Sequence, residues 1–396
     1  MLRRLSRISS PFDSQQYTAT VLAANLDLLR QGRERPLYSR FYNEQMLMEG
    51  IFAAVTTPFY ADERVYFRKI EANMARYSRS LLAGMVVLGS TGEAVLLDDA
   101  ETRNVLRVAA KATAPEKVLI AGVGRESVKA TVELAEAAAQ FQYDAVLVRA
   151  PSYYSGQISM AAVLHHFRSV ADRSPLPVVL YNIPKFVPYQ IPVEVIAELA
   201  HHPNIIGIKD SSGSVERIRA TVAATQNAPR RKVPVTQVFE AVTGRMLTPR
   251  SEASGSFVAA SNLAGGVAVA APPLAAPIKT REREVGFQVL SGSGSTIFES
   301  LQAGASGVIV AIAAFAPQAC QESYIAWKDH DLELAREKQQ RIAAAEKQVV
   351  GDLGIAGIKY ACDFNGYYGG RPRAPLLPLT AEEKVKVGRL LTELRN

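Results

Sequence analysis

Short apolar segments alternate with helical segments along most of this chain, and the alternation constrains the fold more than any other feature. Each apolar segment is short and rich in β-branched residues, and each precedes a stretch with the spacing of an amphipathic helix. They are residues 51–58, 84–88, 118–123, 145–148, 178–181, 205–209, 287–290 and 308–312. Eight such parallel βα units, over about 250 residues, predict an α/β fold of the (β/α)8 (TIM) barrel type.

An open doubly wound sheet is the alternative fold for this pattern. Such a sheet usually carries a glycine-rich dinucleotide turn after its first strand. Here the first strand ends in Thr56-Thr57-Pro58, which is no such turn, so the barrel is favoured.

The barrel is expected over residues 49–316, with further helices in residues 317–396, namely two in 317–350 and one in 381–394. Residues 228–285 interrupt it with six prolines, many small residues and no clear period, which predicts a loop or disordered insert. The insert follows the sixth helix, so it should lie on the face away from the chemistry. An interaction segment or an inert insertion is therefore favoured over a functional lid.

The charge distribution limits the classes of partner. Residues 1–48 carry a balance of +3 and the insert one of +4, which together equal the net charge of +7. A nucleic-acid-binding core would carry its own basic face, so nucleic acid is not an expected partner. No run of 18 apolar residues occurs, so no membrane span is expected.

Residues 1–48 are basic, contain several serines and hold few acids. This composition fits a transit segment and equally a disordered or helical arm, so a mitochondrial and a cytoplasmic location both stay open. The only two cysteines, Cys320 and Cys362, argue against a disulfide framework and a zinc site. The histidines, such as the adjacent pair His165-His166, lack the spacing of metal ligands on a helix, and no metal is expected.

Lys209 is the first candidate for catalysis, because it stands where the apolar strand 205–208 ends. Catalytic residues of such barrels come from the C-terminal ends of the strands. Burial there disfavours the charged ammonium form and provides the neutral, nucleophilic amine that Schiff-base chemistry needs. The alternative is a lysine that extends its charged end into solvent.

Two further features fall at other strand ends. In Gly89-Ser90-Thr91-Gly92-Glu93, two glycines flank two hydroxyls ahead of a helix, and exposed N–H groups there could bind a substrate carboxylate. Ordinary turns have the same composition. Tyr181 ends the strand before that of Lys209, where a phenol could transfer protons to and from a substrate oxygen. A packed tyrosine with a satisfied hydroxyl is the alternative.

These motifs together resemble the dihydrodipicolinate synthase / N-acetylneuraminate lyase superfamily of class I aldolases. The resemblance covers about residues 50–227 and 286–394. It is carried, in this order, by Gly89-Ser90-Thr91-Gly92-Glu93, Tyr181-Asn182-Ile183-Pro184 and Gly207-Ile208-Lys209-Asp210. Within the superfamily the chain is most similar to 4-hydroxy-2-oxoglutarate aldolase, through Tyr153-Tyr154, Ser159-Met160-Ala161-Ala162, His165-His166 and the loop 366–375.

The resemblance implies a Schiff base between Lys209 and the ketone carbon of a 2-oxo acid, with Tyr181 as the proton-transfer residue. The protonated imine is the electron sink, so neither a metal nor an organic cofactor is needed. The family also implies a homotetramer, in which Tyr154 completes a proton relay from a neighbouring subunit. The resemblance further implies that Ser90 and Thr91 contact the substrate carboxylate and take part in the relay, with Ser90 among the catalytic residues. The other residues implied to contact substrate are Gly89, Ser211 and Gly292.

One position departs from the family pattern. Dihydrodipicolinate synthases usually place an arginine two residues beyond the proline of the Tyr-Asn-x-Pro motif, and Phe186 stands there in this chain. This argues against dihydrodipicolinate synthesis and leaves another cation, such as Lys185, to bind a second carboxylate.

The expected reaction is therefore cleavage of 4-hydroxy-2-oxoglutarate, or a related 4-hydroxy-2-oxo acid, to pyruvate and an aldehyde such as glyoxylate. The alternatives are a 2-keto-3-deoxy sugar-acid aldolase, a 4-hydroxy-tetrahydrodipicolinate synthase and a non-catalytic barrel that binds 2-oxo acids.

Overall fold

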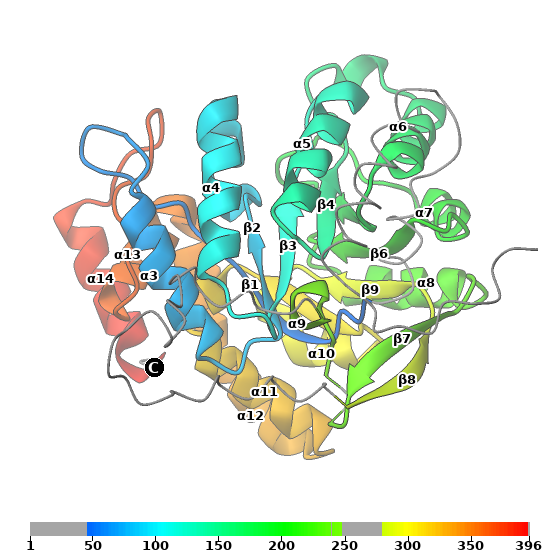
Figure 1. Cartoon of the computed structure of the whole chain (residues 1–396). Coiled ribbons are helices and arrows are strands. Elements are labelled where there is room, and N and C mark those ends of the chain that lie inside the picture. Colours follow the sequence, from blue (N-terminus) through cyan, green and yellow to red (C-terminus); the bar gives the residue numbers. More distant parts are fainter. Residues whose placement is uncertain (1–45, 239, 248–278, 395–396) are drawn as a thin grey trace, which may run out of the picture.

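The computed structural model describes residues 46–238, 240–247 and 279–394. Eight parallel strands close into a barrel in the order β1-β10-β9-β6-β5-β4-β3-β2 (Figure 1). They are β1 (Gly50–Ala54), β2 (Gly84–Val87), β3 (Val118–Gly122), β4 (Ala145–Arg149), β5 (Val178–Asn182), β6 (Ile205–Asp210), β9 (Gln288–Ser291) and β10 (Gly307–Val310). The predicted (β/α)8 barrel is confirmed.

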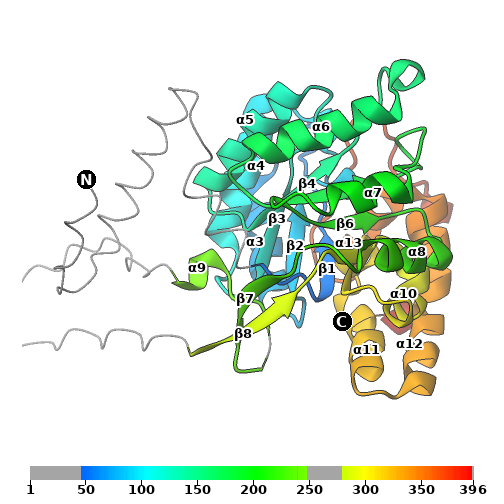
Figure 2. The same ribbon diagram turned by 90° about the vertical axis from the view of Figure 1, so that its right-hand side faces the viewer.

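Helices surround the barrel and continue past it at the C-terminal end of the chain (Figures 1 and 2). They are α3 (Phe67–Ser78), α4 (Asp99–Ala112), α5 (Val128–Gln140), α6 (Met160–Arg173), α7 (Val193–Leu199), α8 (Val215–Thr225), α10 (Ile297–Gln302), α11 (Pro317–Lys328), α12 (Leu332–Ala345), α13 (Gly354–Phe364) and α14 (Ala381–Leu391). Local sequence sets where several begin. Asp98 and Thr380, for example, open α4 and α14 with capping boxes. No helix in the described ranges is long and apolar enough to cross a bilayer.

The barrel strands form the centre of the hydrophobic core. All residues of β1, β2, β3, β5 and β6 are buried. The inner face of each strand packs inside the barrel and the outer face packs against helices, so neither face meets solvent. This double burial explains why the strands appear in the sequence as continuous apolar runs.

The insert differs from the predicted loop, because its two ends pair as strands. β7 (Arg231–Thr236) and β8 (Thr280–Val285) form an antiparallel ribbon outside the barrel, and the short helix α9 (Gly244–Leu247) follows β7. Alternate residues of β7, Val233 and Val235, are buried in a small cluster with Leu47 and Val285. Pro234 within the strand hid this alternation from the sequence analysis.

Contacts to the barrel place the ribbon and α9 at the N-terminal ends of the strands. Arg283 pairs with Glu49, which directly precedes β1, and Arg245 pairs with Asp144, which directly precedes β4. The middle of the insert, residues 248–278, and the part of the N-terminal extension up to residue 45 lie outside the described residues.

The C-terminal region holds one helix more than the sequence analysis expected. α11 and α12 fall within 317–350 and α14 within 381–394, but α13 was missed. Glycines at 351, 354 and 357 interrupt the apolar period there. A π-helical segment, Glu346–Asp352, joins α12 to α13.

Candidate active site

Three polar side chains form one row across the C-terminal ends of neighbouring strands. Arg149 of β4 is paired with Tyr181 of β5, and Tyr181 is paired with Lys209 of β6. Residues directly paired across adjacent parallel strands project from the same face of a sheet. The three side chains therefore belong to one face of the barrel wall.

The amine of Lys209 is buried and has no hydrogen-bond or ion-pair partner among the described residues. The residue is 4% exposed, and Nζ lies 4.4 Å from the centroid of the Tyr181 ring. The adjacent carboxylate, Asp210, is engaged elsewhere, since Oδ2 accepts from Arg217 Nε at 2.7 Å and from Asn182 Nδ2 at 2.9 Å. The structure thus contradicts the alternative in which Lys209 reaches into solvent.

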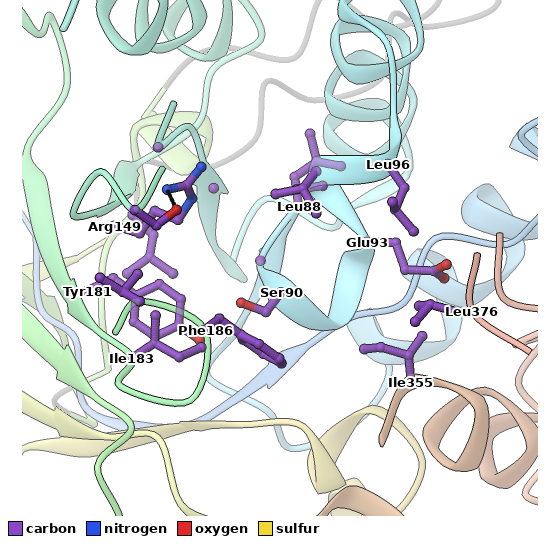
Figure 3. A pocket seen from close by; sticks show the side chains of 18 of the residues that line it. Leu88, Ser90, Glu93, Leu96, Arg149, Tyr181, Ile183, Phe186, Ile355 and Leu376 are labelled. Carbon is purple, nitrogen blue, oxygen red and sulfur yellow. Dashed lines mark hydrogen bonds between the residues drawn. The ribbon is translucent and has the colours of Figure 1, made fainter. Parts of the chain in front are cut away.

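Tyr181 and Ser90 open onto the same pocket, which has a volume of about 410 Å³. Figure 3 shows Arg149 and Tyr181 on one wall and Ser90 on another. Lys209 does not line this pocket, but its Nζ contacts the ring of Tyr181, which does. Much of the remaining wall is apolar and includes Leu88, Val95, Leu96, Ile183, Phe186, Val187, Ile355 and Leu376.

The turn from Gly89 to Glu93 has the geometry of an anion cradle. Ser90–Gly92 forms one 3-10 turn, and the hydroxyl of Thr57 donates to Gly92 O at 2.6 Å. The N–H groups of Ser90 and Thr91 donate to no acceptor in the described part of the chain. Two neighbouring free N–H groups are suited to a carboxylate.

Glu93 ends this turn in a left-handed conformation, with φ of 54°, and its carboxylate is buried. Lys359 of α13 donates to Glu93 Oε1 at 2.5 Å and to Thr57 O at 2.8 Å. The N–H of Arg373 donates to Glu93 Oε2 at 2.8 Å. Burial lowers the pKa of Lys359, and the charge of Glu93 opposes that shift. The tail of the chain therefore fixes the turn, a role for Lys359 that the sequence analysis missed.

Ser211 and Gly292 meet beside the ends of β6 and β9. A Cβ built on Gly292 would lie 1.9 Å from Ser211 Oγ, so only glycine fits against this serine as it stands. The N–H of Gly292 donates to Asp210 O at 2.7 Å. Neither residue lines the pocket of Tyr181 and Ser90, so their predicted contact with substrate stays a prediction.

Tyr154 lies apart from the other predicted residues. It follows β4, is 63% exposed and contacts the ring of Tyr153 with 5.0 Å between centroids. It does not line the pocket within one chain. Its predicted role depends on a neighbouring subunit and stays a prediction.

The cation on the pocket wall is Arg149, not Lys185. Lys185 is exposed and donates to Gly351 O at 3.2 Å, whereas Phe186 lines the pocket. The fourth strand was expected to end at residue 148, whereas β4 extends to Arg149, which was not among the predicted site residues. The signal was present, because a cation that directly follows an apolar strand had identified Lys209.

A metal site has no ready ligand set in the described ranges. There, no three His, Cys, Asp or Glu side chains gather closely enough to hold an ion. Cys320 and Cys362 are both buried and free.

Comparisons with known proteins place the chain among aldolases and synthases. It is 28% identical over 353 residues to a probable mitochondrial 4-hydroxy-2-oxoglutarate aldolase of Emericella nidulans, a match that covers 88% of this chain and 95% of that one. It is 25% identical over 348 residues to a 4-hydroxy-tetrahydrodipicolinate synthase of Methanothrix thermoacetophila, with 88% and 97% covered.

Solved structures share the fold. A prophage protein of the dihydrodipicolinic acid synthase family from E. coli K12, in complex with pyruvate, matches with a TM-score of 0.69 and 25% identity over 88% of this chain and 99% of that one. A dihydrodipicolinate synthase of Bacillus anthracis matches with a TM-score of 0.71 and 22% identity, covering 89% and 100%.

The family model described as "Dihydrodipicolinate synthetase family" matches residues 47–229 and 240–394, which includes every barrel strand and the C-terminal helices. The chain therefore belongs to the dihydrodipicolinate synthetase family, a family of carbon–carbon lyases within the class I aldolase superfamily.

Proposed function

We propose that this enzyme cleaves a 4-hydroxy-2-oxo acid to pyruvate and an aldehyde through a Schiff base on Lys209, with 4-hydroxy-2-oxoglutarate as substrate and glyoxylate as the aldehyde. One observation carries the proposal. The amine of Lys209 is buried, lacks a partner among the described residues and contacts the ring of Tyr181, which lines the pocket.

In the proposed reaction, Nζ of Lys209 attacks the ketone carbon C2, water leaves and a protonated imine forms. The N–H groups of Ser90 and Thr91 hold the C1 carboxylate. The phenol of Tyr181 gives its proton to the departing water, and the resulting phenolate accepts the proton of the C4 hydroxyl. The C3–C4 bond breaks, and its electron pair moves into the enamine as the aldehyde departs. Tyr181 then protonates C3 with the proton it received, and water adds to the imine carbon while the phenolate takes the proton of that water. Pyruvate and the free lysine are released.

The names of relatives support a pyruvate-dependent lyase, but they do not decide between the aldolase and the synthase reactions. A relative named as a 4-hydroxy-2-oxoglutarate aldolase and a structural neighbour solved with pyruvate both favour a pyruvate-dependent lyase. Several relatives are named as 4-hydroxy-tetrahydrodipicolinate synthases, which makes that reaction the second candidate. Phe186, where those synthases usually carry an arginine, favours the aldolase.

The proposed assembly is a homotetramer in which Tyr154 of a neighbouring subunit completes the proton relay to Tyr181. The exposure of Tyr154 in the single chain is compatible with such a contact.

Borohydride trapping tests the proposal directly. Pyruvate with borohydride should add one reduced adduct, located by mass spectrometry on the peptide that contains Lys209. Lys209→Ala should abolish the adduct, whereas Lys185→Ala, which removes an exposed lysine outside the pocket, should retain it. An unlabelled Lys209 peptide would overturn the Schiff-base mechanism. A panel of 4-hydroxy-2-oxo acids and the synthase substrates, assayed for pyruvate release or consumption, separates the two candidate reactions.

A further inference from the structure

We infer that Arg149 binds the second carboxylate of the substrate and thereby selects dicarboxylic 4-hydroxy-2-oxo acids over monocarboxylic ones. The inference deepens the proposed function and rests on it. Arg149 acts as a specificity residue and has no place in the bond-breaking steps.

The row of paired strand ends gives the first argument. Tyr181 stands between Lys209 and Arg149, because it is paired with each of them. Lys209 would hold C2, and Tyr181 would act at the C4 oxygen. The substituent beyond C4 then extends along the row toward Arg149. Two strand spacings, roughly 10 Å between the backbones of β4 and β6, leave room for a five-carbon acid between the two inward side chains.

The charges on the pocket wall give the second argument. Of the described residues that line the pocket, only Glu93 and Arg149 carry charge. Glu93 is already satisfied by Lys359 and by the N–H of Arg373. A carboxylate that entered this largely apolar pocket would lose hydration and would need a cation in return. Arg149 is the cation on this wall.

The guanidinium of Arg149 is held in place with donors to spare. Nη2 pairs with Glu126 Oε1 at 2.8 Å, and Nη1 donates to Ala150 O at 3.1 Å and to Ser152 Oγ at 3.4 Å. These contacts leave Nε–H and one Nη2–H without an acceptor among the described residues. An arginine with two free N–H groups can donate them to the two oxygens of a second carboxylate, in a forked geometry.

Glu126 serves as the anchor for this arrangement. Its carboxylate accepts the N–H groups of Ser152 at 2.9 Å and Tyr153 at 3.0 Å. Burial raises the pKa of Glu126, but these two N–H groups and Arg149 outweigh it and bring the pKa to about 2. Glu126 is therefore ionised at neutral pH and fixes one side of the guanidinium.

The neighbouring strand end accommodates the arginine stem. A Cβ built on Gly124 would lie 2.7 Å from Arg149 Cγ and 2.7 Å from Arg149 N. The absence of a side chain at 124 thus allows Arg149 to lie along the pocket wall, which both residues line. The direction of the Arg149 side chain is therefore set by packing between the ends of β3 and β4 and not by a free choice of rotamer at the surface.

The test compares two substrates of equal chain length, 4-hydroxy-2-oxoglutarate and 4-hydroxy-2-oxopentanoate, which lacks the second carboxylate. Arg149→Met should lower kcat/KM for the dicarboxylate on the order of 30- to 100-fold more than for the monocarboxylate, mainly through KM. Arg149→Lys should keep part of the preference, because a point charge remains without the fork. Lys185→Met, which removes a cation outside the pocket, should leave the ratio as in wild type.

The outcomes separate this inference from the proposed function. If Arg149→Met still forms the pyruvate adduct under borohydride but the substrate ratio does not move, the specificity role is wrong and the aldolase stands. Equal losses for both substrates would show a structural role and would also overturn the inference. A wild-type enzyme that prefers the monocarboxylate, or a ratio that changes in Lys185→Met, would do the same. Failure of wild-type trapping would refute the proposed function itself.

Discussion

Two lysines are buried at the mouth of this barrel, and they differ in what surrounds the amine. Lys209 Nζ lies 4.4 Å from the ring centroid of Tyr181, and Lys359 Nζ lies 4.3 Å from that of Phe59. Lys359 donates to the carboxylate of Glu93 and to the carbonyl of Thr57. Lys209 has neither kind of partner among the described residues.

This difference sets the lysine with structural partners apart from the one to which the proposed mechanism assigns the Schiff base. Burial beside an aromatic ring is common to both, so burial alone does not identify a nucleophile. A lysine paired with a buried carboxylate compensates the charge of that carboxylate as an ammonium ion. In this form its nitrogen has no free electron pair and cannot act as a nucleophile. A buried lysine without such a partner has no evident structural purpose at that position and is available for covalent chemistry.

The sharpest test of the comparison is Lys209→Ala. We expect kcat to fall by roughly 10³-fold or more, because the covalent route is lost. The free energy of unfolding should change little, since no described acceptor loses a partner. Pyruvate release and urea denaturation measure the two quantities. Residual turnover near wild type, or a large loss of stability, would reverse the roles assigned to the two lysines.

Lys359→Met should show the opposite pattern. It leaves the carboxylate of Glu93 buried and unpaired, and we expect it to destabilise the fold by about 3–5 kcal/mol. The double variant Lys359→Met/Glu93→Gln removes both charges and should recover much of that loss. Urea denaturation of the single and double variants measures the coupling. If the double variant is as unstable as the single one, the ion pair is not the cause.

Tyr181→Phe keeps the ring beside Lys209 and removes only the hydroxyl. We expect kcat to fall by roughly 10²-fold, because proton transfer at the C4 oxygen loses its residue. The borohydride adduct on Lys209 should still form, more slowly. Loss of the adduct together with loss of stability would mean that the hydroxyl acts in packing and not in proton transfer.

The smallest expected effect concerns Glu126, the carboxylate that pairs with Arg149. The pKa of Glu126 lies at about 2, below its ordinary value of 4.5. A depressed pKa contributes stability above the unfolded value that is lost as the pH falls through the folded value. Wild type should therefore lose slightly more stability between about pH 5 and pH 2 than Glu126→Gln does. Equal slopes for the two proteins in thermal unfolding across this window would contradict the assignment.

Local patterns made part of this site predictable. Lys209, Tyr181 and Ser90 each follow an apolar strand, and the barrel brings all strand ends to one face. The resemblance of these motifs to the family then implied a role for each residue. The structure places the three residues around one pocket or in direct contact with its wall.

The remaining features depend on contacts that no local pattern encodes. Glu93 and Lys359 are 266 residues apart, and Lys359 is the one cation of α13, with nothing in the neighbouring sequence to indicate its partner. Arg149 and Gly124 matter to one another only because β3 and β4 are neighbours. The β7–β8 ribbon joins the two ends of the insert, where Pro234 masks the strand period.

The contact of α13 with the Gly89–Glu93 turn has a consequence for synthesis. A chain interrupted before residue 354 would already possess every barrel strand and Lys209, the proposed nucleophile. It would lack both groups that donate to the carboxylate of Glu93, the amine of Lys359 and the N–H of Arg373. The Gly89–Glu93 turn is thus fixed by residues that follow every barrel strand in the chain, so a product truncated before residue 354 would have a closed barrel whose pocket wall lacks these contacts.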